Sequence, residues 1–308
     1  MNDLFYDRKA SPMLIKEQQS PFDSEDFIYE IKFDGIRCIA YLDDEVDLRN
    51  RRNVKMIKSF PEMWNINKQV SDKCILDGEL VVLKDGKPDF YEVQRRTIMT
   101  DTFKIQLFSN KYPASFIVFD ILYYKGKELL STPLIERKEL LQSVIKENNR
   151  IINSRYIDTY GKQLFDLVKE QKLEGIVAKR KDSEYYLGKR TGCWIKCKIY
   201  DLIDAVVCGY IYKSNNMTSI IIGQYKGSKL IYKGHVELGA GIKKLNKHGY
   251  KVIDQSPFGY IPHGSEEAVW IQPDIVCTIE FMPSDREAMR LPVFKEIRDD
   301  ISPIECQV

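Results

Sequence analysis

Apolar positions along the chain fall mainly into short runs with the spacing of β-strands. Near the N-terminus, residues 27–31 and 38–42 are aromatic and β-branched, and a polar stretch with a glycine separates them. This arrangement is typical of two strands joined by a turn, and it predicts a hairpin. Residues 74–83 and 116–124 form longer, nearly continuous apolar runs, which predict strands buried within a core.

Helical patterns are fewer. One helix is predicted to begin at Thr132-Pro133 and to run through Leu141, because proline is tolerated in the first turn of a helix. A second is predicted from about Lys162 to Lys172, because apolar residues recur there on one face. After it the pattern returns to strands, at residues 173–181 and 194–198.

From Asp204 onward, short apolar runs alternate with turn residues, and one short helix is predicted after Gly241. Runs at this spacing are typical of a small all-β barrel. At 308 residues the chain is long enough for two domains with buried cores. The patterns predict an α+β first domain, residues 1–200, of antiparallel sheets with flanking helices, and an all-β second domain, residues 201–308.

The composition, 44% hydrophobic and 30% charged, is that of a soluble globular protein. No run of 18 apolar residues occurs and the N-terminus lacks an apolar signal core, so we expect no membrane segment and a cytoplasmic protein. The seven cysteines form no C-x-x-C pair, and the three histidines lack zinc-ligand spacing. Scattered thiols of this kind fit a reduced compartment.

The net charge is only +2, so a polyanionic partner would have to be held by local clusters of cations. Residues 1–200 contain 35 basic and 31 acidic side chains, whereas the remainder contains 12 and 14. Residues 179–198 include seven basic side chains and only two acidic ones, interleaved with aromatic residues. The first domain is therefore expected to carry the anion-binding work.

The polar stretch between the first two predicted strands, residues 32–37, combines a lysine, a carboxylate, a glycine and an arginine. A lysine amine held in a cleft away from water is a nucleophile that can attack an electrophilic phosphorus. The same residues also fit an ordinary hairpin turn with charged side chains. Short motifs match by chance too often for Lys32 alone to decide between the two.

Carboxylates interrupt several of the apolar runs. Asp77-Gly78-Glu79 lies inside the run 74–83, where a polar group costs a few kcal/mol unless it is paired or binds something. A turn at this point is an alternative, but residues 84–87 are a better turn, so Glu79 is expected to point into a site. Asp120 follows Phe119 in the next buried run, and Glu174 stands at the mouth of the strand 173–181.

Two cationic groups accompany these carboxylates. With the period of a strand, Lys196 and Lys198 share one face and could clamp a polyphosphate, although an exposed amphipathic strand would show the same alternation. Three arginines between residues 49 and 52 could reach phosphates or a ribose, or could form a solvated face. The sequence leaves both readings of these arginines open.

Taken in order, these features form a family pattern. The motifs are Lys32-x-Asp34-Gly35-x-Arg37, Asp77-Gly78-Glu79, Phe119-Asp120, Glu174-Gly175-x-x-x-Lys179 and Trp194-x-Lys196-x-Lys198. Their order resembles that of the ATP-dependent DNA ligases of the covalent nucleotidyltransferase superfamily. The lead-in Pro12-Met13-Leu14, the run 29–37 and the tail are similar to the ligase module of bacterial non-homologous end-joining ligases.

The resemblance implies a nucleotidyltransferase (adenylation) domain followed by an oligonucleotide-binding (OB) fold. It also implies ATP and Mg²⁺ or Mn²⁺ as cofactors, with Lys32 as the residue that becomes adenylylated. Glu79 and Glu174 would hold the metal and the ribose, and Asp34 would support the metal or the DNA 3′-hydroxyl. Phe119 would stack on adenine.

Other roles follow from the same resemblance. Arg37 and Arg51 would contact ribose and phosphate, and Lys196 and Lys198 would neutralise the α-phosphate. Glu30 and Ile31 would belong to the nucleotide pocket. Arg298 in the tail would act mainly in the first chemical step. Many family members carry a lysine soon after this arginine, where this chain has Ile301.

By resemblance the protein is expected to seal 5′-phosphate/3′-hydroxyl breaks in duplex DNA, in repair by end joining. Its expected partners are duplex DNA with nicks or ends, the end-binding protein Ku and a separate end-joining polymerase. No extra DNA-binding domain fits ahead of Lys32, so we expect a minimal monomeric clamp associated with the nucleoid.

Three alternatives remain at this point. An RNA ligase or a messenger-RNA capping guanylyltransferase would share the lysine chemistry, although the tail and lead-in argue against both. A non-catalytic DNA end-binding module could keep the fold without the activity. The presence of Lys32, Glu79, Glu174, Lys196 and Lys198 together argues against that loss.

Overall fold

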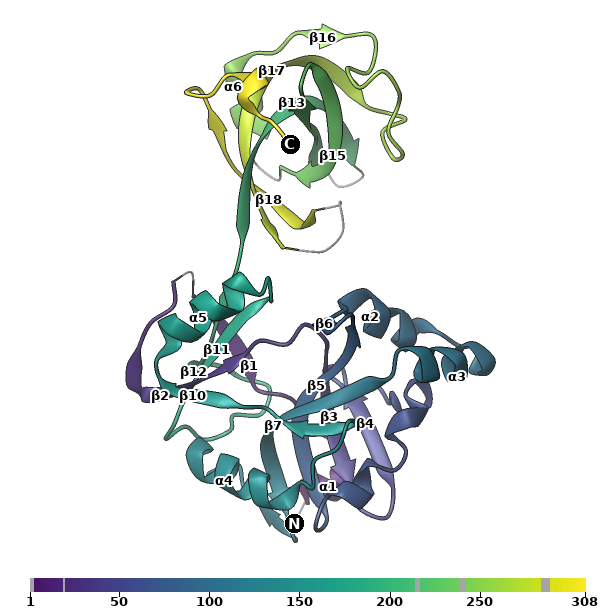
Figure 1. The fold of residues 1–308 in the computed structure, drawn as a ribbon, viewed down its shortest axis with the longest axis vertical. Coiled ribbons are helices and arrows are strands. Elements are labelled where there is room, and N and C mark those ends of the chain that lie inside the picture. The colour runs from purple at the N-terminus through teal and green to yellow at the C-terminus, as the bar shows by residue number, and fades with distance from the viewer. Residues whose placement is uncertain (1–2, 19, 214–216, 239–241, 284–288) are drawn as a thin grey trace. The chain divides into compact units, whose positions relative to one another are not determined.

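The computed structural model describes residues 3–18, 20–213, 217–238, 242–283 and 289–308. The chain divides into two compact units, Met1–Lys198 and Ile199–Val308 (Figure 1). The boundary expected from the sequence, between residues 200 and 201, lies just after this division. In the described part of the chain, every helix is too short or too polar to span a bilayer.

One sheet of the first unit has seven strands. Five follow the order β4-β3-β5-β7-β8, with β6 paired to β5 and β9 to β7. The strands are β3 (Ile36–Leu42), β4 (Val46–Asn50), β5 (Cys74–Lys84), β6 (Lys87–Pro88), β7 (Ala114–Tyr124), β8 (Lys127–Glu128) and β9 (Ile151–Asn153). The buried strands predicted at 74–83 and 116–124 are confirmed as β5 and β7. The predicted turn after β5 is also confirmed, since Asp85 and Gly86 both have positive φ, 52° and 79°.

The second sheet of this unit has five strands in the order β1-β12-β11-β2-β10. They are β1 (Leu14–Gln18), β2 (Ser24–Ile31), β10 (Tyr156–Thr159), β11 (Gly175–Arg180) and β12 (Arg190–Lys198). Most strand pairs are antiparallel, as expected from the sequence, but β1 runs parallel to β12 and β9 runs parallel to β7. Each parallel pair joins strands separated by intervening elements, which a local pattern cannot reveal.

The predicted hairpin between β2 and β3 is wrong. β2 pairs with β10 and β11, whereas β3 pairs with β4 and β5 in the other sheet. The segment 32–35 therefore crosses from one sheet to the other. Gly35 lies in this crossing, where a Cβ would come within 2.3 Å of the Leu80 carbonyl oxygen, so any side chain would clash with β5.

The run 38–42 is continuously apolar because both faces of β3 are buried. Its alternate residues Cys38, Ala40 and Leu42 enter a core on one face of the seven-stranded sheet. Ile39 and Tyr41 enter a second core on the other face. Because this second core also contains Trp194 of β12, it links the seven-stranded sheet to the five-stranded one.

Helices flank the sheets of the first unit. They are α1 (Leu4–Asp7), α2 (Phe90–Ile98), α3 (Thr102–Lys111), α4 (Leu134–Val144) and α5 (Gly161–Glu170). Single turns of 3-10 helix, at Ile57–Ser59, Pro61–Met63 and Ile66–Gln69, follow β4. The two helices predicted for this unit are confirmed as α4 and α5, whereas α1, α2 and α3 were not predicted.

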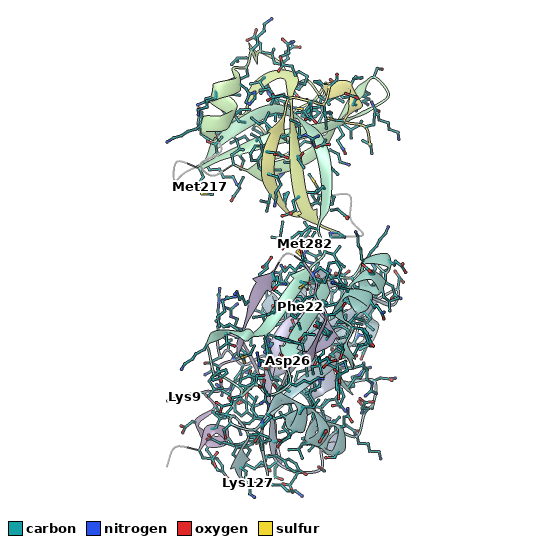
Figure 2. All side chains as sticks on the ribbon, turned by 90° about the vertical axis from the view of Figure 1, so that its left-hand side faces the viewer. Lys9, Phe22, Asp26, Lys127, Met217 and Met282 are labelled. Atoms are coloured by element: carbon teal, nitrogen blue, oxygen red, sulfur yellow. The ribbon has the colours of Figure 1, made fainter. Side chains whose placement is uncertain are left out.

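The second unit is a six-stranded antiparallel sheet in which β15-β14-β13-β17-β16 follow one another and β18 pairs with β17 (Figures 1 and 2). Its elements are β13 (Asp201–Lys213), β14 (Met217–Lys226), β15 (Lys229–Glu237), α6 (Ile242–His248), β16 (Val252–Ile253), β17 (Val269–Met282), β18 (Arg290–Arg298) and a 3-10 turn at Pro303–Glu305. Apolar side chains from β13, β14 and β17 fill its main core, among them Val207, Ile222 and Ile279.

Candidate active site

A pocket lies beside the segment that crosses between the two sheets of the first unit. It is lined by Ile15, Glu30, Ile31, Lys32, Phe33, Arg37, Glu79, Phe119, Val177, Lys179 and Trp194. These residues come from strands of both sheets, so the pocket is formed where the sheets face each other. Of the predicted site residues, the pocket brings together Glu30, Ile31, Lys32, Arg37, Glu79 and Phe119.

Lys32 is held at the start of β11. Its backbone N–H donates to the Gly175 carbonyl at 2.9 Å, and its Nζ lies 2.6 Å from Glu174 Oε2. Gly175 has φ of 144°, and a Cβ there would lie 2.2 Å from the Cys197 carbonyl oxygen. Only glycine permits this close packing of β11 on β12, which places Glu174 beside the lysine.

The two lysines of β12 occupy different surroundings. Lys198 Nζ lies 3.9 Å from Glu174 Oε1, so Glu174 stands between Lys198 and Lys32. Burial lowers the pKa of Lys198 despite the attraction of Glu174. Lys196 Nζ instead pairs with Glu17 of β1 at 2.7 Å, and Lys196 lies outside the pocket lining. The predicted alternation is nevertheless present, since Cys197 between them is buried.

Glu79 lies on β5 opposite Arg37 of β3. Burial raises the pKa of its carboxyl to about 8, because the nearby charges of Lys32 and Arg37 do not offset the loss of water and Glu174 adds repulsion. A cation bound beside Glu79 and Glu174 would remove this penalty. The two carboxylates are thus candidates for holding a hard divalent ion.

The described residues contain no group of three or more histidine, cysteine, aspartate or glutamate side chains arranged to hold a metal ion. Mg²⁺ commonly takes only one or two protein carboxylates and completes its shell with water and substrate phosphates. Glu79 and Glu174 therefore fit such an ion together with a bound polyphosphate. Asp34, the third predicted ligand, is partly exposed in the crossing segment and lies outside the pocket lining.

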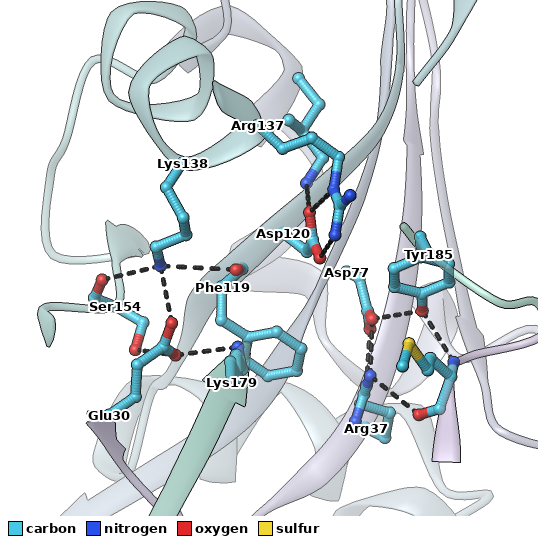
Figure 3. Close-up of polar contacts among 12 residues, drawn as sticks. Glu30, Arg37, Asp77, Phe119, Asp120, Arg137, Lys138, Ser154, Lys179 and Tyr185 are labelled. Carbon is cyan, nitrogen blue, oxygen red and sulfur yellow. Dashed lines mark hydrogen bonds and ion pairs between the residues drawn. The ribbon is translucent and has the colours of Figure 1, made fainter. Parts of the chain in front are cut away.

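Arg37 is locked to Asp77. Its Nε and Nη2 donate to the two carboxylate oxygens of Asp77, each at 2.6 Å, and its guanidinium lies 4.5 Å from the centre of the Phe119 ring (Figure 3). Tyr185 donates from its hydroxyl to Asp77 Oδ2 at 2.5 Å and accepts from the Met13 N–H at 2.9 Å. Asp77 thus orients Arg37, which explains a carboxylate inside an apolar strand.

A second buried ion cluster surrounds Glu30 (Figure 3). Lys138 Nζ donates to Glu30 Oε1 at 2.9 Å, while Lys179 Nζ and Ser154 Oγ donate to Oε2 at 3.0 and 2.8 Å. Lys179 also lies 4.2 Å from the ring centre of Phe119. Burial lowers the pKa of Lys179 to about 8. Burial alone would raise the pKa of Glu30, but the two ammonium groups outweigh it and lower the pKa.

Sequence reasoning did not include several of these side chains in the site. Lys179 and Trp194 stood in the sequence motifs without an assigned role, and the others are Ile15, Phe33 and Val177 of the lining, and Lys138 and Ser154 beside it. A signal existed for Lys138. Positions 134, 137, 138, 141 and 144 form the buried face of α4, and two of them are Arg137 and Lys138. Charged residues at core positions of a helix require buried partners, which here are Asp120 for Arg137 at 2.7 Å and Glu30 for Lys138.

The remaining predicted residues lie elsewhere. Arg51 is exposed in the turn after β4, outside the pocket lining. Arg298 belongs to the second unit, where it pairs with both oxygens of Asp300 at 2.8 and 2.7 Å. Ile301 packs against the buried cluster of Val206, Val276 and Cys306. An apolar residue at this position therefore has a packing role within its own unit.

Comparison with known proteins shows the family to which this chain belongs. A family profile described as "ATP dependent DNA ligase domain" matches residues 10–198, and one described as "ATP dependent DNA ligase C terminal region" matches residues 213–301. The chain belongs to the ATP-dependent DNA ligase family. The expected fold, a nucleotidyltransferase domain followed by an OB-fold domain, is confirmed, as is the expectation of a DNA ligase enzyme.

Individual relatives agree. The chain is 30% identical over 292 residues to the SPbeta prophage-derived DNA ligase-like protein LigB of Bacillus subtilis, covering 94% of this chain and 99% of that protein. It is 26% identical over 310 residues to the multifunctional non-homologous end joining protein LigD of Mycolicibacterium smegmatis, covering 96% of this chain but 39% of that protein. A solved structure, mycobacterial DNA ligase D complexed with ATP and MES, has the same fold, with a TM-score of 0.58, 24% identity and coverage of 97% and 98%.

Proposed function

We propose that this member of the family seals breaks between a 5′-phosphate and a 3′-hydroxyl in duplex DNA through a lysyl-AMP and an adenylylated DNA intermediate. The observation that carries the proposal is the position of Lys32. Its amine lines the pocket, forms an ion pair with Glu174, and shares that carboxylate with Lys198.

The first step forms a bond between Lys32 Nζ and the α-phosphorus of ATP and breaks the bond to pyrophosphate. The ammonium of Lys32 must lose a proton before it attacks, and Glu174 Oε2 at 2.6 Å is the group placed to receive it. Negative charge accumulates around phosphorus in such transfers, so nearby cations stabilise the transition state. Lys198 is the nearer of the two β12 lysines to Glu174 and is assigned this role, with Lys196 as a second cation.

In the second step an oxygen of the DNA 5′-phosphate attacks the α-phosphorus and Lys32 leaves. In the third, the 3′-hydroxyl attacks the 5′-phosphorus, AMP leaves, and the strand is sealed. A divalent cation, Mg²⁺ or Mn²⁺, would add positive charge at the phosphates, held by Glu79 and Glu174 with Asp34 nearby.

The pocket walls fit a nucleoside. Phe119 offers an aromatic face and Val177 an apolar one within the same lining, so we assign Phe119 to stacking on adenine, with Glu30 and Ile31 at the edge of the base. Arg37 and Arg51 are proposed contacts to ribose and phosphate. Arg298 is proposed to serve chiefly the first step, through movement of the OB-fold domain.

A role in end joining is favoured by the relation to LigD, whose name describes that process. DNA with nicks or ends would be the substrate, contacted mainly at phosphates and thus in a salt-sensitive manner. Ku and a separate end-joining polymerase are the proposed partners of a monomeric, nucleoid-associated enzyme.

The decisive experiment mixes the protein with α-labelled ATP and magnesium and looks for an acid-labile, alkali-stable protein–AMP adduct. Lys32→Arg is the matched control, because arginine keeps the charge beside Glu174 but is not a nucleophile. GTP in place of ATP tests the capping alternative, and nicked RNA in place of nicked DNA tests the RNA ligase alternative. Binding of DNA ends without any adduct would favour the non-catalytic module.

A further inference from the structure

Lys138 of α4 is a buried cation beside the pocket that belongs to none of the sequence motifs. Its side chain is 2% exposed, and its Nζ donates to Glu30 Oε1 at 2.9 Å, to the Ser154 carbonyl at 3.2 Å and to the Phe119 carbonyl at 3.4 Å (Figure 3). An ammonium has three donors, and all three have acceptors here. This arrangement offsets the large cost of burying the charge.

The three acceptors belong to different parts of the unit. Glu30 lies on β2 of the five-stranded sheet, and Phe119 lies on β7 of the seven-stranded sheet. Ser154 follows directly after β9. Lys138 therefore connects the two sheets at the wall of the pocket. Movement of Glu30 relative to Phe119 would leave a buried N–H donor of Lys138 without an acceptor, and this costs free energy.

Glu30 keeps one acceptor position free. Its Oε2 accepts from Lys179 and Ser154, which uses both lone pairs, whereas Oε1 accepts only from Lys138 among the hydrogen bonds of the described residues. Glu30 lines the pocket, so the remaining lone pair of Oε1 is available to a ligand N–H. A carboxylate oxygen can only accept, which suits an exocyclic amino group and repels a carbonyl oxygen.

We propose that Lys138 is a positioning residue for nucleotide selection. It fixes the position of Glu30 Oε1, with its free lone pair, relative to the Phe119 ring. A purine with a 6-amino group is therefore preferred over one without it. The inference rests on the proposed function, because it takes the pocket to be the site of the purine. It assigns to Lys138 no contact with the nucleotide itself.

The test compares ATP with purine riboside 5′-triphosphate, which lacks the 6-amino group. Binding of each is measured by calorimetry, and adduct formation by the labelled-protein assay. For the wild-type protein we expect about tenfold or greater preference for ATP, since a hydrogen bond to a charged acceptor is lost with the analogue. Lys138→Met should reduce this preference to within about threefold, and Lys138→Arg should retain most of it.

The preference, a ratio of two affinities, separates positioning from general destabilisation. A purely structural role would weaken both nucleotides equally and leave the ratio unchanged, which would overturn the inference. Glu139→Gln, on the exposed face of the same helix, should change neither affinity nor ratio. If Lys138→Met fails to fold, Ser154→Ala removes only the hydroxyl donor to Glu30 Oε2 and should lower the ratio partially; an unchanged ratio there overturns the inference.

The two proposals fail separately. If ATP binds selectively and Lys138→Met abolishes the selectivity, but no adduct forms, the positioning role stands and the proposed function fails. If the wild-type protein forms the adduct with ATP and the analogue equally well, the proposed function stands and the positioning role fails.

Discussion

Lys32 and Glu174 lie 142 residues apart in sequence, yet their side chains are joined by an ion pair of 2.6 Å. The contact depends on the crossing segment of the chain, which leaves the five-stranded sheet at Ile31 and enters the seven-stranded sheet at Ile36. It gives the proposed nucleophile a carboxylate that both orients it and can take its proton.

Glu174→Gln should therefore lower the rate of protein–AMP adduct formation by about 100-fold or more, the scale of a lost general base. The glutamine keeps the shape but accepts protons poorly. Glu170→Gln, at the exposed end of α5, serves as the control and should leave the rate unchanged. Rates measured with labelled ATP that agree within about twofold between the wild type and Glu174→Gln would contradict the assigned role.

The buried carboxyl of Glu79 predicts a pH dependence of stability. Its pKa rises from an ordinary 4.5 to about 8 in the folded protein, with Lys32, Arg37, Glu174 and Asp77 as the charges around it. Between these values the unfolded chain is ionised while the folded one holds a proton. The stability that the folded protein gains by holding this proton on Glu79 is therefore fully present below pH 4.5. It is lost as the pH rises to about 8 and the folded carboxyl ionises.

Glu79→Gln removes this titration. The melting temperature of the variant should exceed that of the wild type at pH 8, and the difference should shrink toward pH 5, in scans without nucleotide or divalent metal. Glu45→Gln on the exposed turn after β3 should follow the wild type at every pH. A constant difference between Glu79→Gln and the wild type would count against the raised pKa.

Removal of the charge of Asp77 should destabilise the first unit. Asp77 is fully buried and holds Arg37 by two hydrogen bonds, so Asp77→Asn leaves the guanidinium of Arg37, whose side chain is only 15% exposed, incompletely paired. We expect a loss of about 3–5 kcal/mol in the free energy of unfolding, measured by urea denaturation. Asp72→Asn breaks the exposed pair with Lys125, which spans 3.9 Å, and should cost less than about 1 kcal/mol.

The tail arginine offers a test of step specificity. Arg298→Ala should slow adduct formation by about tenfold or more, while sealing of a nick that is already adenylylated should change by less than about threefold. Lys295→Ala, on the same strand and paired with Glu280, is the matched control and should affect neither assay. Equal losses in both assays for Arg298→Ala would remove its assignment to the first step.

Local sequence patterns predicted the strands and helices whose burial follows directly from their own residues. The runs that became β5 and β7 are apolar on both faces because each face of their sheet has its own core. Helices α4 and α5 were evident from periodicity. Helices α2 and α3 were missed, although Asp89 and Asp101 accept hydrogen bonds from backbone N–H groups three residues on, at 3.1 and 3.0 Å. These caps were the available signal.

The candidate site was predictable to the extent that its residues sit in ordered motifs. Lys32, Arg37, Glu79 and Phe119 come together in one pocket. The crossing of the chain from sheet to sheet at Gly35 was not predictable, because a strand followed by a turn and another strand has the same local pattern whether or not the strands pair. Lys138 was missed because a motif search passes over helix cores.

The pairing of β1 with β12 has a consequence for biosynthesis. Leu14 aligns with Arg190 and Gln18 with Cys197, so the first strand of this unit has its partner among the last residues of the same unit. The five-stranded sheet cannot close until β12 has been translated. During that interval β1 remains an unpaired strand, which exposes it to premature association with other nascent chains.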